Sequence, residues 1–140
     1  AAGLMGLMIE TGVHAGTDIT GFGFLGHIIK LAQNSGVGVN IDTTAVPFFP
    51  DADGLAKQGL YPAGLGRNRE FYSPSVKTGA EIPPQILDIL FDPQTSGGLL
   101  ICLAVSKAER LLKELLDAGV EDAAIVGEVV DKPAGVVTLK

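Results

Sequence analysis

A run of seven apolar residues, 99–105, constrains the fold of this chain more than any other segment. A strand made only of apolar residues is typical of one that is buried on both faces of a sheet. An amphipathic helix pattern follows it: Ser106 and Glu109 have the spacing of a capping box, and apolar residues recur over 111–116. Such a strand, next to a helix with one apolar face, predicts an α/β or α+β domain.

The rest of the chain interleaves helical and strand patterns. Helices are expected over 1–11, 22–34, 51–59 and 83–90, and strands over 37–41, 124–130 and 136–139. Gly36 is expected to end the second of these helices, and Pro83 and Pro84 to begin the fourth. Two stretches lack a repeat: residues 13–20 predict a short loop and residues 60–78 a long ordered one.

Composition narrows the class of protein. The 140 residues fit one domain, and 46% hydrophobic with 19% charged residues excludes disorder for most of the chain. The net charge is −6 and the basic residues are scattered, which argues against nucleic acid or an anionic membrane as a partner. The single Cys102 excludes an internal disulfide and a multi-cysteine zinc site, so we expect a reducing, cytoplasmic location.

No apolar run reaches the roughly 20 residues that a membrane-spanning helix needs. The chain begins inside a helical pattern and without an initiator Met, so we expect it to be a fragment of a longer protein.

Glycines are frequent, 19 of 140, and they gather in short groups beside Thr, Ser and Asp. Residues 16–23, Gly-Thr-Asp-Ile-Thr-Gly-Phe-Gly, come directly before a helix pattern, where free N–H groups and small side chains suit a phosphate. Asp18 is the only acid between Glu10 and Asp42, which makes it the natural ligand for Mg²⁺. The alternative is that Asp18 or Thr20 simply caps the helix.

Residues 92–98, Asp-Pro-Gln-Thr-Ser-Gly-Gly, form a second candidate segment. Two hydroxyls and two successive glycines suit a backbone nest for an anion, and a rigid turn explains the same residues equally well. In the long loop, Arg67 beside Asn68 has the chemistry to bind a phosphate, although a solvated loop is the simpler interpretation.

Three further residues, two histidines and the cysteine, have side chains that can take part in chemistry. His14 and His27 lie thirteen residues apart, which is not a local metal-ligand spacing, and we interpret His27 as structural. Cys102 lies in the apolar run and is expected to be an inert, buried thiol.

Taken together, four segments resemble one family. Residues 14–27 resemble the signature of the selenophosphate synthetases (selenide, water dikinases), and 91–100 resemble the second hallmark of that family. Residues 62–68 and 127–129 resemble its Pro-Gly-Gly-Thr-x-x-Asn loop and its closing strand, although Ala63 and Leu65 replace a usual Gly and Thr. The first motif also has relatives across the aminoimidazole ribonucleotide synthetase superfamily.

This resemblance implies a fold, a reaction and site residues. The fold is a three-layer α/β/α domain with a mixed sheet, and residues 1–140 correspond to the C-terminal domain of a two-domain, usually dimeric enzyme. That enzyme converts ATP, selenide and water into selenophosphate, AMP and phosphate. Its reactive Cys or selenocysteine lies in the N-terminal domain, so no catalytic residue is expected in this chain.

By the same resemblance, Asp18 is a Mg²⁺ ligand in the ATP cleft. The residues expected to line that cleft are Thr20, Gly21, Thr95, Ser96, Gly97 and Gly98. Two alternatives remain: another ATP-dependent synthetase or kinase of the superfamily, or a binding module without chemistry of its own.

Overall fold

The structure is a computed structural model that describes residues 8–79 and 81–140. In chain order the elements are β1 (Ala15–Asp18), α2 (Gly23–Ser35), β2 (Gly38–Ile41), α3 (Ala52–Lys57), α4 (Ala63–Tyr72), the 3-10 turn η1 (Ser73–Ser75), β3 (Val76–Thr78), α5 (Pro84–Phe91), β4 (Leu99–Cys102), α6 (Val105–Asp117), β5 (Gly127–Val130) and β6 (Val137–Leu139). Residues 8–11 are helical as well. The other residues of the helix expected over 1–11 lie outside the described residues.

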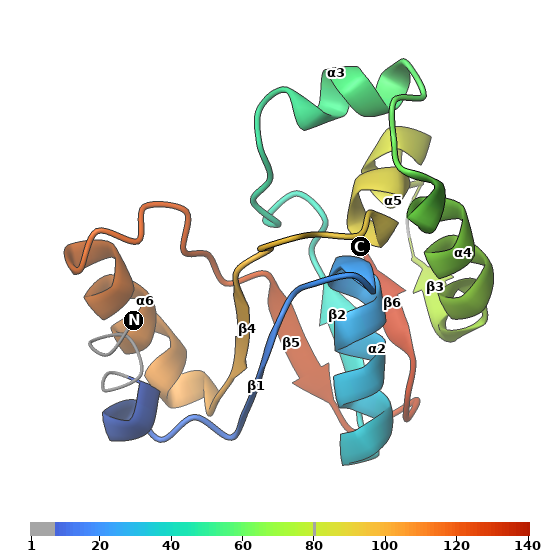
Figure 1. The fold of residues 1–140 in the computed structure, drawn as a ribbon. Coiled ribbons are helices and arrows are strands. Elements are labelled where there is room, and N and C mark those ends of the chain that lie inside the picture. The colour runs from blue at the N-terminus through green and yellow to red at the C-terminus, as the bar shows by residue number, and fades with distance from the viewer. Residues whose placement is uncertain (1–7, 80) are drawn as a thin grey trace.

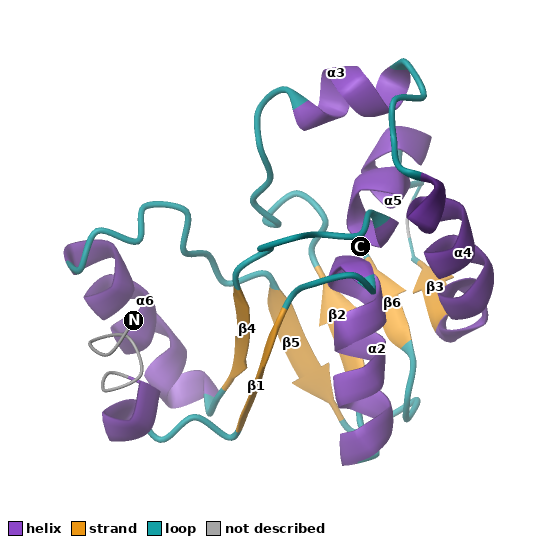
Figure 2. Cartoon of the chain, in the orientation of Figure 1, coloured by secondary structure: helices purple, strands orange, loops and turns teal. Residues whose placement is uncertain are grey.

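The strands form two sheets. Four of them make a sheet in the order β3-β6-β2-β5, in which β6 runs parallel to β2 and β3 while β5 runs antiparallel to β2. The other two, β1 and β4, pair antiparallel with Ala15 opposite Cys102 and Asp18 opposite Leu99. Figure 2 shows this pair beside the larger sheet. The α/β class with a mixed sheet is therefore confirmed.

The core lies between α2 and the four-stranded sheet. Helix α2 packs on β2 and β6 and also contacts α4 and α5, as can be followed in Figure 1. Leu25 and Ile29 of α2 are completely buried, and each such side chain contributes about 1.5–3 kcal/mol through burial. Val137 and Leu139 of β6 face the same cluster. The helical spacing over 22–34 and the alternation over 37–41 thus predicted the two elements on which the core is built.

The apolar run at 99–105 differs from the prediction. Only Leu99–Cys102 is a strand, and within the described chain its one strand partner is β1. Leu99 is 49% exposed to solvent, so the expectation of a strand buried on both faces is wrong. A two-stranded pair has no neighbouring strand on its outer edge, and apolar composition does not reveal how many partners a strand has.

Three predictions of where helices begin or end can be compared with the structure. Gly36 ends α2 with φ 68°, and α5 begins at Pro84 after Pro83, both as predicted. The capping box at Ser106 and Glu109 is wrong, because α6 begins at Val105 with Ala104 at the N-cap position and no side-chain cap, so that Ser106 lies inside the helix.

Both predicted loops contain regular structure. Residues 15–18 form β1, and the long stretch 60–78 contains α4 and β3. Strand β1 exists through its pairing with residues more than 80 positions away, as the register of 18 with 99 shows. Helix α4 buries only Leu65 and Tyr72, so it leaves little apolar periodicity in the sequence.

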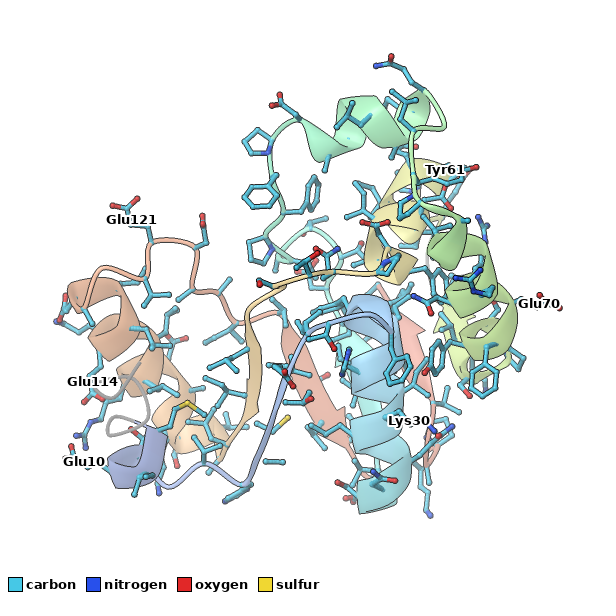
Figure 3. The ribbon with its side chains drawn as sticks, viewed as in Figure 1. Glu10, Lys30, Tyr61, Glu70, Glu114 and Glu121 are labelled. Atoms are coloured by element: carbon cyan, nitrogen blue, oxygen red, sulfur yellow. The ribbon has the colours of Figure 1, made fainter. Side chains whose placement is uncertain are left out.

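Charged side chains are spread over the surface. Lys30 on α2, Glu70 on α4 and Glu121 in the turn after α6 are exposed and point outward in Figure 3. Among the described residues, no helix has both the length and the apolar composition to cross a membrane.

Candidate functional site

The two glycine-rich segments meet in space. The β1–β4 pairing continues beyond Asp18 and Leu99: the Ile19 N–H donates to the Gly98 carbonyl at 2.9 Å, and the Gly97 N–H donates to the Ile19 carbonyl at 2.9 Å. One step further, the Gln94 N–H donates to the Thr20 carbonyl at 3.0 Å. We call residues 18–23 the first loop and residues 92–98 the second loop. Strand pairing brings together two segments that are about 75 positions apart in the sequence.

Two glycines are required where these loops approach each other. A Cβ atom at Gly97 would lie 2.8 Å from Ile19 Cγ2 and 2.9 Å from the Ile19 carbonyl oxygen. A Cβ atom at Gly23 would lie 2.8 Å from the Phe91 carbonyl oxygen, and the backbone there has φ 72°. Side chains at either position would force the loops apart.

Asp18 is the last residue of β1 and is exposed. The described residues contain no group of three His, Cys, Asp or Glu side chains close enough to hold a metal ion together. A single exposed carboxylate does not form an all-protein metal cage. It does fit Mg²⁺, which keeps several waters and combines one or two carboxylates with phosphate oxygens.

Thr20 is held by His27, one turn into α2. The Thr20 N–H donates to His27 Nε2 at 3.0 Å, and the Thr20 hydroxyl lies 3.1 Å from the same nitrogen. An Nε2 that accepts an N–H bond carries no proton, so the neutral ring is protonated at Nδ1. The interpretation of His27 as structural is thereby supported. The hydroxyl of Thr20, which was expected to line the cleft, is directed to this ring.

Neither Asp18 nor Thr20 caps α2. The N-cap position is Phe22, with no side-chain hydrogen bond, and the turn closes through the Gly23 N–H to the Thr20 carbonyl at 3.0 Å. The capping alternative for the first loop is therefore wrong.

The second loop behaves as a rigid turn at its glycines. Because the Gly97 N–H is bonded to Ile19, it is not available to a nest for an anion. Thr95, Ser96, Gly97 and Gly98 are all exposed, as is Gly21 of the first loop. The loops thus present small and hydroxyl-bearing residues to solvent on one edge, beside Asp18.

Asp92 begins the second loop, and the rigid-turn interpretation expects its side chain to bond its own backbone. One carboxyl oxygen, Oδ1, is buried and receives no hydrogen bond from the described residues. Burial raises the pKa of this carboxyl above its ordinary value. An Asp-Pro turn favours an exposed Asp whose side chain bonds its own backbone, so the sequence did not indicate this buried oxygen.

The third candidate segment is helical. Arg67 is exposed on α4 and makes no ion pair with a described residue, whereas Arg69 pairs with Asp88 of α5 at 2.7 Å. Asn68 points the other way: its Nδ2 donates to the Gly21 carbonyl and to the Phe91 carbonyl, each at 3.0 Å. The expected solvated loop is wrong, and Asn68 is the residue of this segment that reaches the two loops.

Two other residues lie away from this edge of the loops. His14 is exposed, and its backbone N–H donates to the Cys102 carbonyl at 2.8 Å. Cys102 is half-buried and not fully buried as expected, and burial raises the pKa of its thiol. A raised thiol pKa disfavours the reactive thiolate, which agrees with an inert cysteine.

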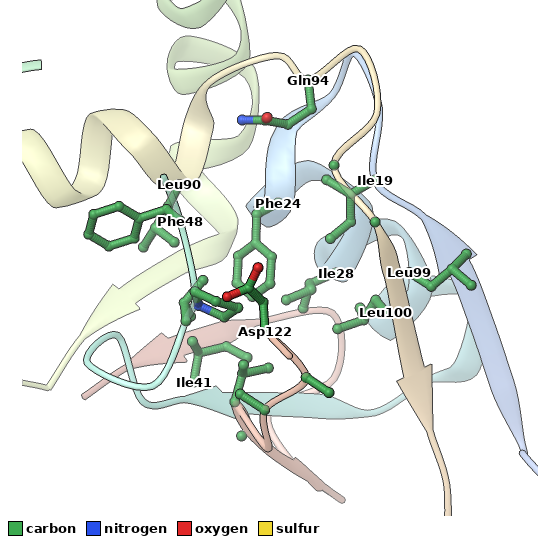
Figure 4. Close-up of a pocket in the computed structure, with 18 of the residues that line it drawn as sticks. Ile19, Phe24, Ile28, Ile41, Phe48, Leu90, Gln94, Leu99, Leu100 and Asp122 are labelled. Atoms are coloured by element: carbon green, nitrogen blue, oxygen red, sulfur yellow. The ribbon is translucent and has the colours of Figure 1, made fainter. Parts of the chain in front are cut away.

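A large cavity of about 1220 Å³ lies on the inner side of the loops. Figure 4 shows Ile19 and Gln94 at its rim, with Phe24, Ile28, Ile41 and Leu100 among the apolar walls. The charged side chains lining it are all carboxylates: Asp88, Asp92, Glu109, Asp122 and Glu128. An apolar cavity whose only charges are negative does not suit a polyphosphate, so the exposed edge of the loops is the better candidate site.

Comparison with known proteins identifies relatives along almost the whole chain. Residues 2–140 match the family described as "AIR synthase related protein, C-terminal domain". A selenide, water dikinase of Pelobacter propionicus is 51% identical over 121 residues, and one of Caldanaerobacter subterraneus is 44% identical over 126. These alignments cover 86% and 90% of this chain, but only 35% and 36% of the relatives. The chain therefore spans about a third of the length of the curated relatives it matches.

A solved structure shares the fold. The hydrogenase maturation protein HypE, crystallised in complex with ATP, superposes with a TM-score of 0.58 at 23% identity. The match covers 95% of this chain and 34% of HypE. At this level of identity the likeness concerns the fold alone.

Proposed function

The chain belongs to the AIR synthase related protein, C-terminal domain family, and on that premise we propose that the intact protein is a selenide, water dikinase. Its reaction would take ATP, selenide and water to selenophosphate, AMP and phosphate. The observation that carries this proposal is the convergence of the first and second loops. Both resemble the hallmark segments of that enzyme, and three backbone hydrogen bonds join them beside Asp18. Relatives bearing this name at 51% and 44% identity support the choice of reaction within the family.

We propose that this chain supplies one wall of a Mg²⁺–ATP cleft, in which Asp18 is a Mg²⁺ ligand. When bound, the metal neutralises phosphate charge that develops during phosphoryl transfer. The exposed edge formed by Gly21, Thr95, Ser96, Gly97 and Gly98 would face the nucleotide, because small residues let phosphate groups approach the backbone. His27 would hold Thr20, and through it the first loop, in place.

The rest of the enzyme is proposed to come from a second domain. Residues 1–140 would form its C-terminal domain, and the other two thirds of the relatives' length would include the N-terminal domain with the reactive residue. By the family resemblance, the intact enzyme would be a homodimer. No residue of this chain is assigned a covalent or proton-transfer role.

Phosphorus NMR of the full-length protein with ATP, Mg²⁺ and selenide tests this proposal. Selenophosphate and AMP are expected to appear together. ATP that stays intact, or that gives only ADP, would contradict it and favour another synthetase or kinase of the superfamily.

The role of Asp18 is tested in the same assay with Asp18→Asn. We expect selenophosphate formation to fall by at least about 100-fold. Mutation of a residue that only hydrogen-bonds to a metal ligand already lowers activity by about 10–100-fold, and loss of the ligand itself should cost more. The matched control is Asp131→Asn, an exposed acid between β5 and β6. Normal turnover in Asp18→Asn would contradict the proposal that Asp18 is a Mg²⁺ ligand, but it would not contradict the proposed reaction.

A further inference from the structure

One face of α4 rests on the junction of the two loops. Gly64, Asn68 and Tyr72 are spaced by four residues and therefore lie on the same side of the helix. A Cβ atom at Gly64 would lie 3.0 Å from Pro93 Cγ in the second loop. At the other end, Tyr72 is packed so closely on α2 that a Cβ atom at Gly26 would lie 2.7 Å from its ring.

Asn68 lies at the middle of this face and bridges the loops. Its one amide nitrogen has two N–H donors, and the two acceptors are the carbonyls of Gly21 and Phe91. Gly21 belongs to the first loop, while Phe91 is the last residue of α5, directly before the second loop. The Phe91 carbonyl is among the last four of its helix, which have no partner within the helix, so Asn68 satisfies it from outside.

The bridge complements the backbone bonds between the loops. Ile19, Gly97 and Gly98 join them where the first loop leaves β1 and the second enters β4. Asn68 joins them at their opposite ends, where the first loop enters α2 and the second leaves α5. Attachments at both ends of a pair of loops oppose rotation of one loop against the other, and the side chain of Asn68 supplies one of these attachments.

We propose that Asn68 is a positioning residue that sets the first loop against the second through the Gly21 and Phe91 carbonyls. Its consequence for activity rests on the proposed function. Asn68 makes no contact with substrate in this role. The third candidate segment thus acts by bracing the site and not by binding phosphate through Arg67.

The test compares Asn68→Asp and Asn68→Ala in the full-length protein, with Asn34→Asp on the exposed side of α2 as the matched control. Aspartate has the shape of asparagine but places a carboxylate against two carbonyl oxygens. We expect kcat to fall about 10- to 100-fold at saturating ATP and Mg²⁺. Displacing reacting groups by about 1 Å can lower the rate of an enzyme by up to about that much. The KM for ATP should change by less than about threefold, because no nucleotide contact is lost.

Hydrogen–deuterium exchange of the same proteins, without ATP, tests the bridge independently of the reaction. Peptides covering 18–23 and 92–98 should exchange about tenfold faster in both variants, while peptides covering β2 and β6 remain unchanged. Unchanged exchange in the two loops would overturn the proposal. Faster exchange throughout the protein would also overturn it, because Asn68 would then hold the fold and not the loops. If the wild-type protein makes no selenophosphate, the proposed function fails, but the exchange result still decides the role of Asn68.

Discussion

Asp92 carries a carboxyl oxygen that is buried without a hydrogen-bond donor, and this costs stability whenever the group is ionised. Burial raises the pKa of Asp92 in the folded protein. The unfolded chain therefore ionises at lower pH than the folded one. The loss of folding stability caused by Asp92 is therefore absent below the ordinary aspartate pKa, and it grows as pH rises through and above that pKa.

Asp92→Asn is expected to raise the Tm at about pH 7 and to have less effect at about pH 3, below the ordinary aspartate pKa. The amide has the shape of the carboxyl but no charge to desolvate. Thermal unfolding at both pH values, with Asp131→Asn as an exposed control, provides the measurement. An equal change of Tm at the two pH values would mean that ionisation is not the cause.

At the scale of an element, the start of α2 depends on one glycine of a neighbouring pair. The backbone of Gly23 has φ 72°. A Cβ atom at this position would lie 2.8 Å from the Phe91 carbonyl oxygen and 2.9 Å from the Asp92 carbonyl oxygen. Gly21, two residues earlier, has open space around the corresponding position. Only one of the two glycines is therefore required by the packing of α2 against the end of α5.

Gly23→Ala is expected to lower the free energy of unfolding by about 1–3 kcal/mol, because both backbone strain and a backbone clash oppose it. Gly21→Ala should stay within about 0.5 kcal/mol of wild type, as exposed substitutions usually do. Urea unfolding of the two variants is the measurement. Equal losses would show that the start of α2 adjusts without cost and that the close approach is not required.

Helix α4 shows why an element can be missed and still matter. Its sequence, Ala-Gly-Leu-Gly-Arg-Asn-Arg-Glu-Phe-Tyr, contains two glycines and only two buried residues. It contributes Gly64, which packs against Pro93, and the amide of Asn68 to the loop junction, and neither produces a hydrophobic repeat. Packing against α2 and α5 stabilises a helix that intrinsic propensity does not favour.

Over the whole molecule, the exposed edge of the loops borders the large cavity, because Ser96, Gly97 and Gly98 belong to both. The cavity lies between the sheet, α2 and α6, and its charges are negative. The edge beside Asp18 has one carboxylate and small polar residues. In the proposed site this edge would supply Asp18 as a metal ligand together with exposed backbone, and no basic residue belongs to residues 18–23 or 92–98.

The 140-residue chain alone is therefore expected to turn over no ATP above the buffer rate, because a lone carboxylate without further ligands holds Mg²⁺ weakly. Phosphate release by the isolated chain, compared with its own Asp18→Asn variant, is the measurement. Hydrolysis that disappears in the variant would contradict the proposal that this chain supplies only one wall.

Sequence alone determined the parts of this protein that depend on neighbours three or four residues away. The apolar spacing over 22–34, the alternation over 37–41 and the prolines at 83 and 84 predicted α2, β2 and the start of α5. The same local reading singled out Asp18 and the two glycine-rich segments, because small residues beside an acid are recognisable without a fold. The roles of those residues stay predictions until the Asp18→Asn variant is measured.

Tertiary structure alone decided how these pieces come together. Strand β1 forms because Asp18 lies opposite Leu99, and β4 is an edge strand because only β1 pairs with it in the described chain. Asn68 reaches Gly21 and Phe91, which lie 47 and 23 positions away. Hydrogen bonds and close contacts over such separations leave no periodic trace in the sequence, so the junction of the loops becomes visible only in the folded chain.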